Sequence, residues 1–165
     1  MSNPYIGWVN FQLVAVRHHL TLLKEESSAN EKLRNRGVLE SAVWHLKRAY
    51  RYYLFELGAN YQLPSPEANL NAGCLSEALD SVGKHPGEAS ELSQLEADGW
   101  IGDLIQALES AEFSNGVITP QSSSAELNLV DLDRQRATLS LDILEQWLAK
   151  FKELIDRHRT MMVEY

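Results

Sequence analysis

Cysteine is almost absent from this sequence, since Cys74 is the one thiol among 165 residues. A single thiol excludes an internal disulfide and any zinc or iron–sulfur site held by several cysteines, and it agrees with a reducing compartment. Long apolar runs are missing too: none approaches the ~18 residues of a membrane helix, and no basic group precedes an apolar segment at the amino terminus. We therefore expect a cytoplasmic protein with no membrane span and no signal peptide.

Proline is sparse, and its placement decides where helices can form. The 5 prolines stand at positions 4, 64, 66, 86 and 120, which leaves residues 5–63 and 121–165 free of proline rings. With 44% hydrophobic residues, the chain has enough apolar side chains for one domain with a buried core. Helix is therefore the expected structure of both stretches.

Basic residues are scarce in the middle of the chain. Residues 1–55 hold 8 Lys and Arg against 4 Asp and Glu, residues 56–135 hold 2 against 14, and residues 136–165 hold 5 of each. Because the net charge is −8, binding of nucleic acid or anionic lipid would need a local basic patch. Only the first third of the sequence has the residues for one.

Apolar residues recur at steps of three and four, the period of an amphipathic helix. The expected main helices cover about residues 4–26, 31–61, 98–113 and 140–163, with short helices at about 74–82 and 87–97 and a loop at 114–137. The stripes expected in the core are Ile6, Val9, Leu13, Val16, Leu20 and Leu23; Leu39, Val43, Leu46, Tyr50, Tyr53 and Leu57; and Ile143, Leu144, Trp147, Leu148, Phe151, Leu154 and Ile155. Asn3, Asn30 and Asp98 are the expected helix caps. We predict a single all-α domain like a four-helix bundle, with the first two helices in an antiparallel hairpin.

The first helix has a second apolar face, although an amphipathic helix needs only one. This second face consists of Trp8, Phe11, Ala15, His18 and Leu22. Either neighbouring elements cover it inside the molecule, or it is an interface with a second copy or another protein, because large exposed apolar patches are uncommon on monomers.

The second helix has a basic face with aromatic rings beside it. Its members are Arg36, Trp44, Lys47, Arg48 and Arg51. Guanidinium groups interleaved with aromatic rings fit phosphate contacts and base stacking in single-strand binders. The other interpretation is a solvated face on which Arg48 packs over Trp44 one turn away.

Residues for catalysis or metal binding lack the required spacing. The adjacent His18 and His19 diverge on a helix, no Glu-x-x-His pair occurs, and the glycines form no phosphate-binding motif. His45 shares a side of its helix with Glu56, and we interpret it as a hydrogen-bonded histidine at the edge of the core. His85 and His158 are interpreted as structural or solvent-facing, and Cys74, just before a short helix, as a lone inert cysteine. We expect no enzyme, no cofactor and no metal.

Several stretches of the sequence follow one family pattern. They are Leu139–Leu141, Glu145–Trp147 and Arg157–Tyr165 near the carboxyl terminus, His45–Leu46 and Glu56–Tyr61 in the second helix, and Asp98–Ile101. In these stretches the chain resembles a family of uncharacterised bacterial proteins of about this length. The resemblance implies the helical fold and no activity, because that family has none assigned.

The hairpin of the first two helices is also similar to HEPN domains, the helical bundles of RNA-cleaving toxins and nucleotide-binding modules. Their nuclease motif is Arg, four to six residues, then His, whereas Arg36 and His45 have eight residues between them. We therefore predict a non-catalytic binding or accessory module that forms a homodimer or binds another protein. The alternative is a HEPN-like nucleic-acid or nucleotide binder that uses the basic face.

Overall fold

The computed structural model describes residues 3–25, 32–107 and 139–163, and these residues are all-α with no strand. The elements are α1 (Tyr5–Glu25), α2 (Lys32–Asn60), the 3-10 turn η2 (Pro66–Ala68), α3 (Ala72–Ser81), α4 (Gly87–Asp98), α5 (Trp100–Gln106) and α8 (Leu141–Val163). The predicted all-α class is confirmed. The predicted loop at 114–137 and the cap Asn30 lie outside the described residues.

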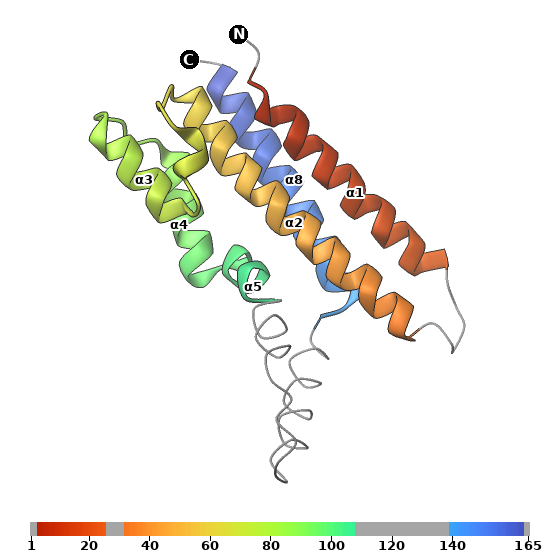
Figure 1. Ribbon diagram of the computed structural model, residues 1–165. Helices are drawn as coiled ribbons and strands as arrows, with labels where there is room; N and C mark the ends of the chain where they lie inside the picture. Colours follow the sequence, from red (N-terminus) through yellow and green to blue (C-terminus); the bar gives the residue numbers. More distant parts are fainter. Residues whose placement is uncertain (1–2, 26–31, 108–138, 164–165) are drawn as a thin grey trace, which may run out of the picture.

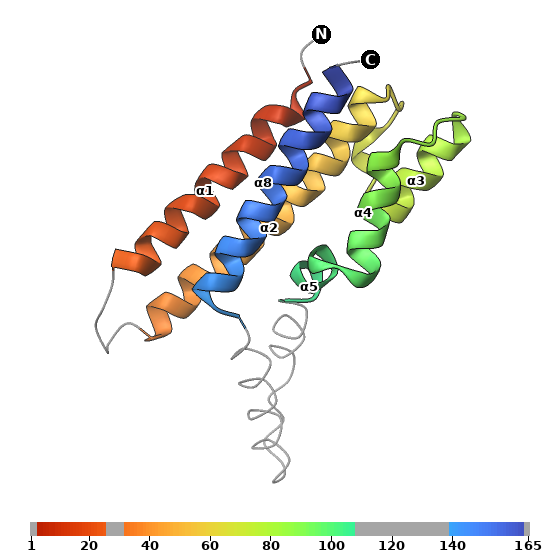
Figure 2. The same ribbon diagram turned by 180° about the vertical axis from the view of Figure 1, so that it is seen from behind.

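Helices α1, α2 and α8 are the three long helices of the described part of the chain, and they lie side by side (Figures 1 and 2). α1 and α2 form the antiparallel hairpin, and α8 packs behind them in the view of Figure 1. α1 begins at the end of the molecule where α2 and α8 finish. Polar side chains near these three helix ends can therefore meet, although they are far apart in the sequence.

The core lies where the apolar stripes of these helices face one another. Phe151 of α8 is fully buried, with its ring centroid 6.2 Å from that of Tyr50 and 5.8 Å from that of Tyr53 on α2. Burial of one large apolar side chain contributes about 1.5–3 kcal/mol, so this facing arrangement stabilises the three-helix contact. The buried members of the stripes are Val9, Leu13, Val16 and Leu20; Val43, Leu46, Tyr50, Tyr53 and Leu57; and Leu144, Trp147, Leu148, Phe151, Leu154 and Ile155.

The short helices α3, α4 and α5 cover the side of α2 that faces away from α1 (Figure 1). Glu96 of α4 ties this layer together, because its Oε1 accepts hydrogen bonds from Tyr50 Oη at 2.6 Å and from the Ala72 amide at 2.9 Å. Within the fourth long helix that the sequence predicts over 98–113, the described residues contain the seven-residue α5, whereas α4 corresponds to the short helix predicted at about 87–97. Residues 108–113 of that prediction are not described.

The amino-terminal cap of α1 is the residue predicted from the sequence, whereas the cap of α5 is a different residue. Asn3 Oδ1 accepts the Tyr5 amide at 3.0 Å, as predicted. Asp98 is not a cap, because α4 continues through it and Gly99 is the amino-terminal cap of α5. Glycine is needed there, since a Cβ on Gly99 would lie 2.9 Å from Leu95 Cα. A Cβ on Gly102 would lie 2.4 Å from the Glu96 carbonyl oxygen, so α5 folds back against α4 at glycine positions.

Candidate functional site

The hairpin brings residues of the two predicted faces to the same side of the molecule. Trp8 and Phe11 of α1 are 53% and 62% exposed, and Trp44 of α2 is 45% exposed. Across the hairpin, the ring centroids of Trp8 and Tyr52 are 5.7 Å apart. Trp8 of the second apolar face therefore lies against Tyr52, one helical turn from Arg48 of the basic face.

Arg48 joins the aromatic rings on α2. Its guanidinium carbon lies 4.4 Å from the ring centroid of Trp44 and 5.5 Å from that of Tyr52, and Nη2 donates a hydrogen bond to Tyr52 Oη at 2.7 Å. Each exposed cation–π contact contributes about 0.5–1 kcal/mol and fixes the orientation of the rings. We call Trp8, Phe11, Trp44, Arg48 and Tyr52 the aromatic–arginine surface.

Some of the other predicted members of the two faces are exposed, and others are partly buried or form an ion pair. His18 and Arg51 are exposed, whereas Ala15, Leu22 and Lys47 are partly buried. Arg36 donates from Nε to Glu40 one turn away at 3.2 Å, so part of its charge is compensated locally. In the predicted basic face, Arg51 is thus exposed, and Arg48 contacts the rings of Trp44 and Tyr52.

His45 lies at the boundary of the hairpin, as interpreted from the sequence. Its Nδ1 is 2.6 Å from Gln12 Oε1 of α1, and its ring centroid is 5.1 Å from that of His19. Burial, and then the nearby charges of His19 and Arg48, lower the pKa of His45 below its ordinary value. Because Glu56 lies eleven residues further along α2, about 16 Å away, no acid–base pair of these two side chains forms.

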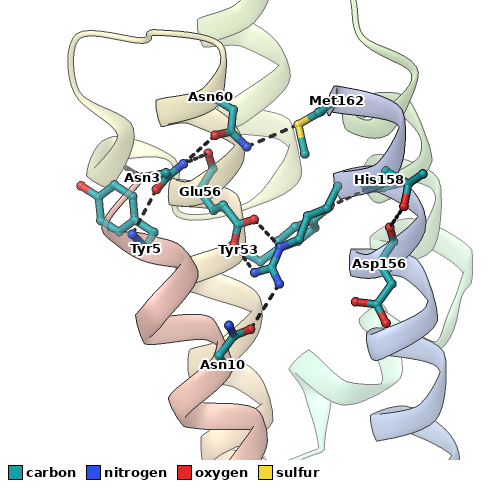
Figure 3. A network of polar contacts seen from close by, with 11 residues as sticks. Asn3, Tyr5, Asn10, Tyr53, Glu56, Asn60, Asp156, His158 and Met162 are labelled. Atoms are coloured by element: carbon teal, nitrogen blue, oxygen red, sulfur yellow. Dashed lines mark hydrogen bonds and ion pairs between the residues drawn. The ribbon is translucent and has the colours of Figure 1, made fainter. Parts of the chain in front are cut away.

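A second cluster lies where the ends of α1, α2 and α8 meet (Figure 3). The fully buried Glu56 accepts two hydrogen bonds from Arg159, Nε to Oε1 at 2.7 Å and Nη2 to Oε2 at 2.8 Å. Arg159 Nη1 also donates to Asn10 of α1 at 3.2 Å, and Asn3 Nδ2 donates to the Glu56 carbonyl oxygen at 2.9 Å. The hydrogen bonds from Arg159 to Glu56 raise the pKa of Arg159, and the contacts of Arg159 with Glu56 and Asn10 link the three long helices.

A histidine relay connects α2, α8 and α4 beside this ion pair. His158 Nδ1 is 2.6 Å from Tyr53 Oη, and His158 Nε2 is 2.8 Å from Glu91 Oε2. Glu91 also accepts two hydrogen bonds from Arg157 at 3.0 and 2.6 Å, which lower the pKa of Glu91. The sequence prediction that His158 is structural or solvent-facing is thus resolved, because its side chain is fully buried between two partners.

The Glu91 carboxylate, the His158 imidazole and the Tyr53 hydroxyl follow one another as in a nucleophilic catalytic triad. The burial of Tyr53 and His158 keeps a substrate away from the hydroxyl. Tyr53 and His158 are both 0% exposed, and burial raises the pKa of Tyr53 above its ordinary value. A catalytic hydroxyl must reach a substrate and lose its proton readily. These hydrogen bonds therefore hold α2, α8 and α4 together.

An open cleft borders the two polar clusters and shares Glu56, Arg159 and Glu91 with them. It is lined by Ile6, Glu56, Asn60, Tyr61, Lys84, His85, Pro86, Gly87, Glu88, Glu91, Arg159, Met161 and Met162. Most of its charged groups already have partners: Arg159 is paired with Glu56, Lys84 Nζ donates to the Tyr61 carbonyl oxygen at 2.6 Å, and His85 contacts Asp80 at 2.7 Å. Among the described residues, no group of three His, Cys, Asp or Glu could hold a metal ion.

Sequence reasoning missed the partners of Glu56 and Glu91, which lie 103 and 66 residues away. One signal was available: Glu56 interrupts the apolar run from Tyr53 to Leu57, and a carboxylate on a buried side needs a cation. Nothing in the spacing identifies Arg159 as that cation.

Cys74, at the start of α3, donates its amide hydrogen to Asn71 Oδ1 at 2.8 Å, and its thiol belongs to neither cluster.

These features define an all-α protein whose buried polar groups join helices and whose exposed aromatic groups gather on one helical hairpin. Within the described ranges, no helix is long and apolar enough to span a membrane. The chain belongs to a family of unknown function, DUF6586, whose model matches residues 17–165. This confirms the predicted membership of an uncharacterised family. The matched range contains Trp44, Arg48 and Tyr52 and begins after Trp8 and Phe11. No curated protein and no solved structure matches the chain.

Proposed function

We propose that this protein is a non-catalytic, cytoplasmic binding module that associates with a second copy of itself through the aromatic–arginine surface. The observation that carries the proposal is the exposure of Trp8, Phe11 and Trp44, at 53%, 62% and 45%, on one side of the hairpin. Adjacent large apolar side chains in water favour an interaction site, because monomers rarely expose contiguous apolar patches.

The composition and order of this surface support the proposal. Trp, Tyr and Arg are the residue types enriched at the energetic centres of protein interfaces. The contacts of Arg48 with Trp44 and Tyr52 hold rings in place before a partner arrives, which reduces the entropy lost on binding. An ordered apolar surface favours binding to a partner, because its rings lose little conformational entropy and are removed from water.

A non-catalytic role is supported by what the polar groups do. Glu56 and Glu91 are paired with arginines of α8, and His158 lies between Tyr53 and Glu91. Each of these groups serves a contact between helices. Because these polar groups serve contacts between helices, the aromatic–arginine surface is the strongest candidate for a functional site.

Sedimentation velocity of the purified, nuclease-treated protein over a range of concentrations tests self-association. We expect a concentration-dependent shift toward larger species, and we expect Trp8→Glu/Phe11→Glu to stay monomeric with unchanged far-UV circular dichroism. Ala149→Glu is the control, because it adds a similar charge at an exposed position of α8. A wild-type protein that remains monomeric at every concentration would reject the proposal.

Nucleic-acid binding is the second candidate, and one arrangement favours it. Arg51 is exposed beside Arg48 and Trp44, so a cation and a ring are available for a phosphate and a base. Fluorescence anisotropy with short single-stranded RNA and DNA at low and high salt tests it. Binding that weakens with salt and requires Arg48 and Arg51 would favour this candidate over self-association.

A further inference from the structure

Acidic residues predominate in the layer formed by α3, α4 and α5. Lys84 is the only Lys or Arg between residues 72 and 107, a range that contains α3, α4 and α5 and holds seven Asp and Glu. In both views, α1 lies along one edge of the molecule and α3 along the opposite edge (Figures 1 and 2). Helix α2, which carries Arg48 and Arg51, lies between these two edges.

Helix α3 has an outward face that complements the aromatic–arginine surface. Glu77 and Asp80 are exposed and three residues apart, so they share one side of the helix. We call Glu77 and Asp80 the acidic α3 face; His85 contacts Asp80 at 2.7 Å.

Symmetric pairing of two aromatic–arginine surfaces is disfavoured by charge. In a two-fold dimer each copy would present the same patch, so Arg48 and Arg51 of one copy would approach those of the other. Like charges across an interface oppose association, whereas opposite charges favour it and set the partner's orientation. The acidic α3 face offers two carboxylates, Glu77 and Asp80, to these arginines.

We propose that self-association is head-to-tail, with the aromatic–arginine surface of one copy docked on the acidic α3 face of the next. This inference rests on the proposed function and names the partner surface. Because the contact joins two different surfaces, a docked pair leaves one of each free, and further copies add as the concentration rises. The association weakens with salt, since exposed charges across it are screened.

Mixing two complementary variants tests the head-to-tail contact. Trp8→Glu/Phe11→Glu keeps the acidic α3 face, and Glu77→Lys/Asp80→Lys keeps the aromatic–arginine surface; all four positions are exposed. We expect each variant alone to be monomeric where the wild type associates, with affinity at least about tenfold weaker. We expect their equimolar mixture to associate, because the intact acidic α3 face of the first variant can dock on the intact aromatic–arginine surface of the second.

The outcomes separate the inference from the proposed function. If Glu77→Lys/Asp80→Lys associates as strongly as the wild type, or if the mixture stays monomeric, the head-to-tail contact is overturned while self-association stands. If the wild type itself never associates, the proposed function fails first. Arg48→Glu/Arg51→Glu replaces the aromatic variant in the mixture if Trp8→Glu/Phe11→Glu loses helicity.

Discussion

Removing the charge of Glu56 should destabilise the whole bundle. The Glu56 side chain is fully buried, and 25% of the Arg159 side chain is exposed. Glu56→Gln keeps the size of the side chain and leaves the Arg159 guanidinium without its counter-charge. Breaking a buried ion pair costs about 3–5 kcal/mol, and we expect the lower end, about 3 kcal/mol, because part of Arg159 reaches water. For a chain of this size that loss lowers the Tm by roughly 6–12 °C.

Urea unfolding followed by circular dichroism measures the loss as a change in the free energy of unfolding. Arg157→Gln is the matched control, because it breaks the pair with Glu91 in which the two side chains are 49% and 33% exposed. That more exposed pair should contribute about 1 kcal/mol or less. The double variant Glu56→Met/Arg159→Met should be less destabilised than Glu56→Gln, since it leaves no buried charge unpaired.

The comparison of the two pairs can refute the reasoning. If Glu56→Gln loses no more stability than Arg157→Gln, water or another cation compensates the buried site and the ion pair does not link the helices. If the double methionine variant is the least stable of all, the charges themselves stabilise the fold, against the desolvation argument.

Three further predictions concern pH and packing. Because Arg157 lowers the pKa of Glu91, the stability from this pair is present above the ordinary glutamate pKa and is lost as the pH falls through the lowered value; Glu91→Gln should therefore cost less stability at pH 3 than at pH 7 in urea unfolding. The pKa of His45 is lowered, so the unfolded chain takes up more protons as the pH falls through about 6.5; His45→Gln should flatten the loss of stability between pH 7.5 and pH 5.5, and an unchanged slope would contradict this. Gly102→Ala places a Cβ 2.4 Å from the Glu96 carbonyl oxygen and should cost about 1–3 kcal/mol in the same assay.

The helices could be predicted from the sequence because their cause is local. A stripe such as Val9, Leu13 and Val16 has the helical period within one segment, and all three side chains are buried in the structure. The cap Asn3 is equally local, since its partner is the Tyr5 amide two residues away. The cap Asp98 was wrongly predicted because the deciding contact is steric, between Gly99 and Leu95.

The polar clusters could not be predicted because their partners come together only in the folded chain. Glu56 meets Arg159 across 103 positions, and no spacing rule relates an acid on one helix to a cation on another. The same limit applies to His158, whose neighbours Tyr53 and Glu91 lie on two different helices. Both clusters depend on α1, α2 and α8 finishing or starting at the same end.

The aromatic–arginine surface differs from these clusters because folding does not require it. The hairpin is already held by Val9, Val16 and the other buried side chains, whereas Trp8 and Phe11 stay more than half exposed. Replacing an exposed apolar residue by Glu changes stability by only about 0.5 kcal/mol when no named contact is lost. Phe11→Glu should therefore leave the free energy of unfolding nearly unchanged and still weaken self-association. A Phe11→Glu variant that unfolds would instead mean that the ring stabilises the monomer, and the functional interpretation of this surface would lose its basis.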